Sequence, residues 1–98
     1  MPRPKKCRRL SIDPPVSYYK PQGIPMRLME TVELKADELE ALSLADYQGL
    51  DQENAAQKMG ISRPTFSRIV NGARKAVAKA LVTGAALKIE KGKENAKF

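Results

Sequence analysis

Residues 62–75 bring together the side-chain types that read nucleic-acid bases and bind phosphate. Arginine binds guanine O6 and N7 through two hydrogen bonds, and asparagine can pair with adenine in the same way. Lysine side chains further along such a segment are better suited to phosphate oxygens. These residue types, in this order, favour DNA recognition. The candidate contacts are Ser62, Arg63, Pro64, Thr65, Ser67, Arg68, Asn71 and Lys75, followed by Lys79.

A second group of cations lies near the N-terminus, in a proline-rich segment with too little apolar content to fold alone. Basic arms of this kind follow the phosphate backbone or enter a minor groove. Cys7 lies among these cations, which favour its thiolate. A redox sensor is one interpretation, and an incidental lone cysteine is the simpler one. The arm is predicted to be a second DNA contact, through Arg3, Lys5, Lys6, Arg8 and Arg9.

The composition argues against several classes of chemistry. The 98 residues include one cysteine and no histidine, so neither a histidine-based catalytic triad nor a histidine-ligated metal site can form. Asp37, Glu38 and Glu40 do not share one helix face, and we expect them to be solvated and not to bind a metal. No positioned nucleophile, base or metal site is visible. We therefore expect no enzymatic activity, no catalytic residue, no metal and no cofactor.

Hydropathy and cysteine content bear on the location of the protein. No apolar run approaches the roughly 18 residues of a membrane-spanning helix. No apolar stretch follows the basic N-terminus, as it would in a secretory signal. The single cysteine cannot form an intrachain disulfide. The expected location is therefore the cytoplasm, with no membrane partner.

Charge changes sign twice along the chain. Residues 1–27 contain seven Lys/Arg and one acid (+6), residues 28–57 one Lys and eight acids (−7), and residues 58–98 ten Lys/Arg and two acids (+8). The net charge is +7 and the pI is about 9.8. Two basic segments in a basic chain indicate a polyanionic partner. The alternative is that many small soluble proteins are basic without binding nucleic acid.

A long helix is needed to present the candidate contacts of residues 62–75. Ser62 is a strong N-cap candidate, and Pro64 is tolerated in a first turn. Gly84 is well placed to end the helix after Thr83. Apolar residues recur at steps of three and four and form one stripe. The predicted buried stripe is Phe66, Ile69, Val70, Ala73, Val77, Ala80 and Leu81.

The segment before this helix has the spacing of a helix-turn-helix, which we predict over Gln52–Asn71. Asp51 can cap a short first helix, in which Ala56 supplies the small residue needed where the second helix crosses. Gly60 can adopt the positive φ that the turn requires. Ile61 then locks the turn with an apolar side chain. The alternative is a plain three-helix bundle whose charges only solvate its surface.

The remaining elements surround this motif. A helix is predicted over Ala36–Gln48, because its first-turn acids suit the macrodipole and Gly49 can end it. Alternating residues predict a short strand at Thr31–Leu34, and a second short strand is predicted at Ala86–Ile89. The two could pair within one chain or between two swapped chains. The predicted fold class is mainly α. It comprises a three-helix helix-turn-helix domain with two short flanking strands over residues 28–90, an extended basic arm over residues 1–27 and a polar tail over residues 91–98.

Several segments together resemble a family of small, largely uncharacterised prokaryotic proteins predicted to bind DNA through a helix-turn-helix like that of sigma-factor region four. The resemblance runs through MPRPKK, PPV and YKP, then ELEALSLADYQGLDQENAAQKMGISRPTFSRIVNGARKAVAKAL, and ends with TGAALKIE. It covers most of the chain. It implies DNA binding by Gln52–Asn71 and no enzymatic activity. The chain departs from the pattern at Lys35, where a Ser or Thr cap is usual, and at Asn54, where Glu is common.

The sequence thus predicts a sequence-specific binder of double-stranded DNA that regulates transcription. The alternative is a sigma-like interaction module that docks on the transcription machinery, with RNA polymerase as partner. RNA is a weaker candidate because its major groove is narrow. A homodimer is expected, because one module gives limited specificity and an apolar strip at Val77, Ala80 and Leu81 needs a cover. The three tyrosines, Tyr18, Tyr19 and Tyr47, are expected to pack against the helical core.

Overall fold

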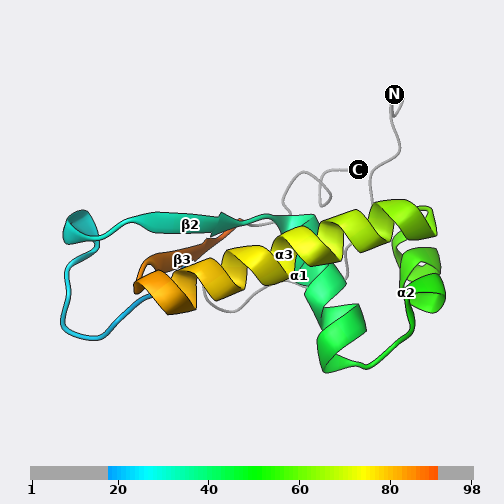
Figure 1. Cartoon of the computed structure of the whole chain (residues 1–98), viewed down its shortest axis with the longest axis horizontal. Helices are drawn as coiled ribbons and strands as arrows, with labels where there is room; N and C mark the ends of the chain where they lie inside the picture. Colours follow the sequence, from blue (N-terminus) through cyan, green and yellow to red (C-terminus); the bar gives the residue numbers. More distant parts are fainter. Residues whose placement is uncertain (1–17, 91–98) are drawn as a thin grey trace.

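A computed structural model describes residues 18–90, which form three helices and a small three-stranded sheet. The longest helix, α3, runs along the molecule, with the sheet beside its C-terminal half and α2 at its N-terminal end (Figure 1). The expected mainly helical fold is confirmed, with three strands where two were predicted. The elements are β1 (Tyr18–Tyr19), a 3-10 turn (Met26–Leu28), β2 (Thr31–Leu34), α1 (Ala36–Leu42), a π-helical turn (Ser43–Tyr47), α2 (Gln52–Met59), α3 (Arg63–Thr83) and β3 (Ala86–Ile89).

Helix α3 begins and ends where its sequence predicts. The Ser62 side chain accepts a hydrogen bond from the Thr65 amide at 3.3 Å, which satisfies one of the first-turn amides. At the other end Gly84 has φ +73°, and the amides of Gly84 and Ala85 both donate to the Ala80 carbonyl. A left-handed residue after the last turn is the usual way to satisfy these carbonyls. The 21 residues between these caps form one uninterrupted helix.

The core has two parts, one at each half of α3. Near its N-terminus α3 packs against α1 and α2, and near its C-terminus it packs against the sheet. Full burial of each large apolar side chain contributes about 1.5–3 kcal/mol. The first cluster is Ala41, Leu44, Ala55, Ala56, Met59, Phe66 and Val70. The second is Leu34, Ala73 and Ile89, with Leu39, Leu42, Ala76, Val77 and Leu87 packed against it.

Helix α1 starts without a side-chain cap from Lys35 and is stabilised by two carboxylates instead. The Lys35 amide donates to Glu38 Oε1 at 2.9 Å, and the Ala36 amide donates to Glu90 Oε1 at 3.1 Å. A Cβ on Gly72 would lie 3.1 Å from Glu38 Oε2. Gly72 therefore allows the start of α1 to approach α3 closely, which explains a glycine in the middle of a long helix.

The helix predicted over Ala36–Gln48 changes type partway. It is α-helical only to Leu42 and continues as a π-helical turn through Tyr47, in which the Gln48 amide donates to the Ser43 carbonyl at 2.8 Å. The Gln48 side chain also donates to Ser43 Oγ at 3.2 Å, which stabilises the wider turn. After this turn, the Leu50 amide donates a hydrogen bond to the Leu44 carbonyl and holds the following segment against the turn.

The two predicted strands pair with each other within the chain, which is one of the two arrangements expected for them. β3 lies in the centre, parallel to β2 and antiparallel to β1. Thr31 aligns with Ala86 and Leu34 with Ile89. The third strand, Tyr18–Tyr19, lies in the segment predicted to be an arm with little regular structure. The folded part of the chain thus begins earlier than expected.

Five side chains differ from their expected burial. Tyr47 is 88% exposed, and Tyr18 and Tyr19 are also exposed at the edge of the sheet, because two-residue pairing with β3 leaves their rings uncovered. Leu81 belongs to the predicted buried stripe but is 78% exposed, because the sheet covers the adjacent side of α3, where Ala80 is buried. Glu40 was expected to be solvated, yet it is only 3% exposed.

Candidate nucleic-acid interface

A tight three-residue connection joins α2 to α3. Asp51 Oδ1 accepts from the Asn54 amide at 2.8 Å and caps α2, so Asn54 does not weaken its start. Gly60 has φ +71°, and its amide donates to the Gln57 carbonyl. The Ile61 amide donates to the Ala56 carbonyl at 3.0 Å. This pair of bonds is the standard arrangement after a glycine that ends a helix, and it fixes the direction in which α3 starts.

The buried face of α3 determines which of its side chains remain available. Phe66 and Val70 are fully buried, while Ile61 and Ile69 pack against the same cluster. Because residues three and four positions apart lie on one face of a helix, burying this stripe turns the stripe around Arg63, Ser67 and Asn71 outward.

Five of the predicted contact residues on α3 are exposed on this outward face. Arg63, Pro64, Arg68, Asn71 and Lys75 are exposed. From Arg63 to Lys75 they extend for about 18 Å of helix axis at 1.5 Å per residue. Helix α3 contains five cations and no acid, so no carboxylate of its own opposes a polyanion on this face. The cations are Arg63, Arg68, Arg74, Lys75 and Lys79.

Three of the predicted contacts are less available than their types suggest. The Ser62 hydroxyl accepts from the Thr65 amide and donates to Thr65 Oγ1 at 2.9 Å. Both hydroxyls are thus engaged in the start of α3, and Thr65 is half-buried. Ser67 is also half-buried. These three side chains mainly position the helix. Arg63, Arg68 and Asn71 are the exposed side chains that can extend towards a ligand.

An ion pair missed by sequence reasoning lies beside this face. Arg74 donates from Nε to Asp46 Oδ2 at 3.0 Å and from Nη2 to Asp46 Oδ1 at 2.9 Å. These hydrogen bonds lower the pKa of the Asp46 carboxyl and raise the pKa of the Arg74 guanidinium. Arg74 Nη1 also lies 3.5 Å from Asn71 Oδ1. Asp46 and Arg74 are 28 positions apart, so no local sequence signal predicts their ion pair. The two side chains meet because the fold brings the π-helical turn next to α3.

The structure also bears on the N-terminal arm, on metal binding and on membrane-spanning helices. The arm cations Arg3, Lys5, Lys6, Arg8 and Arg9, together with Cys7, lie outside the described residues. Among residues 18–90, no group of three or more acids or cysteines is placed to hold a metal ion. In the same part of the chain, no helix is long and apolar enough to cross a membrane.

Comparison with known proteins identifies the family but gives no activity. Residues 1–97 match the family described as "Protein of unknown function DUF134". The chain belongs to this DUF134 family. The predicted family resemblance is thus confirmed as far as membership of an uncharacterised family. No solved structure matches the chain.

Several bacterial members of the DUF134 family carry the name UPF0251 protein. The relative from Desulforudis audaxviator is 55% identical over 92 residues, covering 94% of this chain and 60% of its own length. That from Moorella thermoacetica is 53% identical and covered to 62% of its length. A relative from Dehalococcoides mccartyi is 56% identical and covered to 79%. The chain therefore spans about three fifths of the length of the first two relatives.

Proposed function

We propose that the chain binds double-stranded DNA, with α2 and α3 acting as a helix-turn-helix over Gln52–Asn71 similar to that of sigma-factor region four. The observation that carries the proposal is the exposed cationic face of α3. It holds Arg63, Arg68 and Lys75 on a helix whose opposite face is anchored by the fully buried Phe66. A rigid helix with such a face fits the major groove of B-form DNA, which is wide enough to admit it.

The charge on α3 supports DNA in preference to an acidic protein surface. The macrodipole adds partial positive charge at the N-terminal end of α3, where Arg63 lies. Arginine and asparagine side chains at that end match the acceptor and donor atoms at base edges, whereas Lys75 lies further along and suits phosphate. Together these groups provide both base reading and backbone attachment. We propose a regulatory role in transcription, and not catalysis, for such a protein.

The direct test is a mobility-shift assay of the full chain on a pool of random duplexes, with RNA of equal length as competitor. We expect duplex DNA to be retained and RNA to compete poorly. Repeated selection from the retained pool should enrich one sequence, because α3 presents residues that read bases. Binding without enrichment would reduce the function to non-specific attachment.

A matched variant links the binding to α3. Arg68→Ala should lose the enrichment, whereas Lys58→Ala, an exposed cation on α2 with the same change of charge, should retain it. Loss of binding in neither variant would place the interface elsewhere on the chain. No retention of duplex DNA at low salt by the wild-type chain would overturn the proposal and favour an interaction module of the transcription machinery.

A further inference from the structure

Exposed apolar side chains gather at the end of the molecule opposite the start of α3. Leu81 is 78% exposed and Val82 is 84% exposed in the last turn of α3. Tyr19, Ile24 and Leu28 are exposed in β1 and the loop that leads to β2. This loop and the C-terminal end of α3 lie at the same end of the molecule (Figure 1). We call these five residues the apolar end patch. A cluster of this kind on a small protein usually marks an interaction site.

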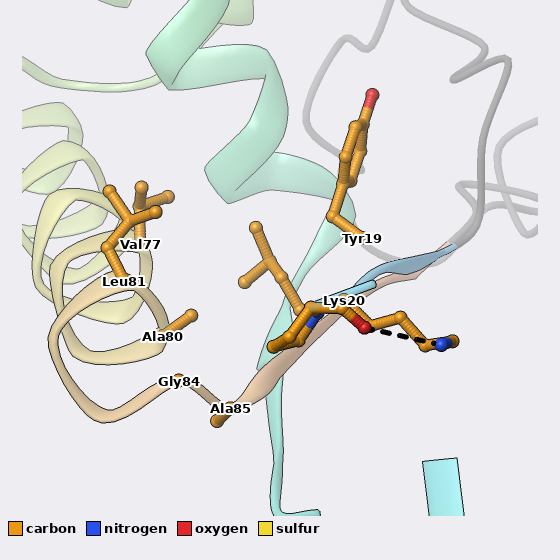
Figure 2. A pocket seen from close by; sticks show the side chains of 9 residues that line it. Tyr19, Lys20, Val77, Ala80, Leu81, Gly84 and Ala85 are labelled. Carbon is orange, nitrogen blue, oxygen red and sulfur yellow. Dashed lines mark hydrogen bonds between the residues drawn. The ribbon is translucent and has the colours of Figure 1, made fainter. Parts of the chain in front are cut away.

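A groove runs beside the patch. It measures about 300 Å³ and separates the end of α3 from β1. Val77, Ala80 and Leu81 form one wall, and Tyr19 rises on the other (Figure 2). Leu81 therefore lines the groove and is also largely exposed, and Val82 follows it in the same last turn of α3, so that a hollow and a ridge adjoin at this end of the molecule.

We propose that a second copy of this chain covers the apolar end patch, with Leu81 and Val82 of each copy entering the groove of the other. A two-fold interface uses the same surface on both partners, so that surface must be complementary to itself. An adjacent ridge and groove meet this requirement. Such a dimer would present two copies of the proposed DNA-binding helix. Only the argument about DNA half-sites below rests on the proposed DNA binding.

The charges around the patch also fit a second copy better than a strongly charged partner. Lys20 lines the groove, and its ammonium donates to the Ile24 carbonyl at 2.8 Å. Glu30 is exposed at the same end, where its carbonyl accepts from the Ala86 amide at 2.8 Å. With Arg27, which is exposed beside Leu28, this end of the molecule carries two cations and one acid, so each copy supplies both signs to a two-fold interface.

The position of the patch agrees with the needs of DNA recognition. Leu81 lies about 27 Å along the helix axis from Arg63, at 1.5 Å per residue. Two copies joined at this end keep both α3 N-termini free. Half-sites one helical turn apart lie about 34 Å from each other. Two α3 helices that meet at their C-terminal ends and diverge from there can span that separation.

Sedimentation equilibrium of the full chain at micromolar concentration, without DNA, tests the proposal. We expect a mass twice that of the 10.8 kDa chain for the wild type and the monomer mass for Leu81→Glu. Tyr47→Glu is the matched control, because Tyr47 is 88% exposed but lies in the π-helical turn, away from the patch. It should remain a dimer. Far-UV circular dichroism should match the wild type in both variants.

Each contrary result has a definite meaning. A monomeric wild type would overturn the proposal, whether the patch is covered by another segment of the chain or by a different protein. A dimer that survives both Leu81→Glu and Val82→Lys would place the interface elsewhere. If Leu81→Glu does not fold, Val82→Lys decides alone. A dimer that does not retain DNA would overturn the proposed function and leave the dimer intact. A monomer that retains DNA would overturn the dimer and leave the proposed function intact.

Discussion

At the scale of single residues, the arginines of α3 differ in what already holds them. Arg74 is engaged by both oxygens of Asp46, whereas Arg68 is exposed and makes no ion pair within residues 18–90. An arginine that is not paired with a carboxylate has all five of its N–H donors available for a ligand. Arg68 is therefore better placed than Arg74 to read a base, although the sequence alone does not distinguish the two.

Replacing Arg68 with Ala is expected to weaken binding to the selected duplex by roughly 1–3 kcal/mol, which is typical for a lost base contact. Affinity for random duplex should change much less. Fluorescence anisotropy on both duplexes at one salt concentration measures the difference. Lys79→Ala serves as the comparison, and it should weaken both duplexes to the same extent. Equal losses for Arg68→Ala on both would make Arg68 a phosphate contact.

The Asp46–Arg74 pair gives stability a dependence on pH. The hydrogen bonds from Arg74 hold the pKa of Asp46 below its usual value of 3.8 in the folded state. A carboxyl with a lowered folded pKa adds stability that is present above its unfolded pKa and is lost as the pH falls through its folded pKa. Both side chains are nearly half exposed, so we expect less than about 1 kcal/mol.

Asp46→Asn is therefore expected to melt slightly below the wild type at pH 7. The difference should vanish as the pH falls below the ordinary carboxyl range, because the wild-type Asp46 is then protonated as well. Thermal melting from pH 7 to pH 2.5 measures this, with Glu53→Gln on exposed α2 as the control that keeps the pair. A difference that stays constant with pH would show that Asp46 stabilises the fold without its charge.

At the scale of elements, the turn between α2 and α3 depends on one backbone conformation. Gly60 has φ +71°, and a residue with a Cβ pays about 1–2 kcal/mol in that region. Gly60→Ala should thus lower the melting temperature by about 4–8 °C for each kcal/mol in a domain of this size. Gly60→Asn should lower it less, because asparagine tolerates the left-handed region. An unchanged melting temperature for Gly60→Ala would contradict this account of the turn.

Local signals were enough to predict where α2 and α3 start and stop. Asp51, Ser62 and Gly84 act through their own neighbours, so their caps can be read from the sequence. The π-helical turn could not be predicted, because five residues are too few for its wider i→i+5 spacing to show in the pattern of apolar residues. The exposure of Tyr47 and Leu81 was missed for a related reason: a helical stripe gives a direction, but the neighbouring elements decide whether anything covers it.

At the scale of the whole molecule, the sheet shows what short segments cannot predict. β2 shows a detectable alternation and β3 was also predicted as a strand, but their parallel register joins segments more than fifty residues apart. β1 is only two residues long, too short for any periodicity. The relative positions of the candidate contacts from 62 to 75 were easier to predict, because these residues lie on consecutive turns of one helix. Its one missed neighbour, Asp46, comes from a different element.

The arm and the helices can be separated by their response to salt. Arg3, Lys5, Lys6, Arg8 and Arg9 lie well before Tyr18, where the described fold begins. Deleting residues 1–9 should therefore leave the helices folded. Each neutralised phosphate contributes about 0.9 to the slope of log K against log salt concentration. If the arm lies along DNA, the deletion should flatten this slope by a few units.

The measurement is a titration of duplex DNA at several salt concentrations, with circular dichroism to verify that the deleted chain is folded. A second variant that keeps the length but replaces the five arm cations with glutamine should flatten the slope by the same amount, since charge and not chain length sets it. If only the deletion has an effect, the arm acts through contacts other than phosphate. A slope unchanged in both variants would remove the arm from the interface and leave α3 as the whole electrostatic contact.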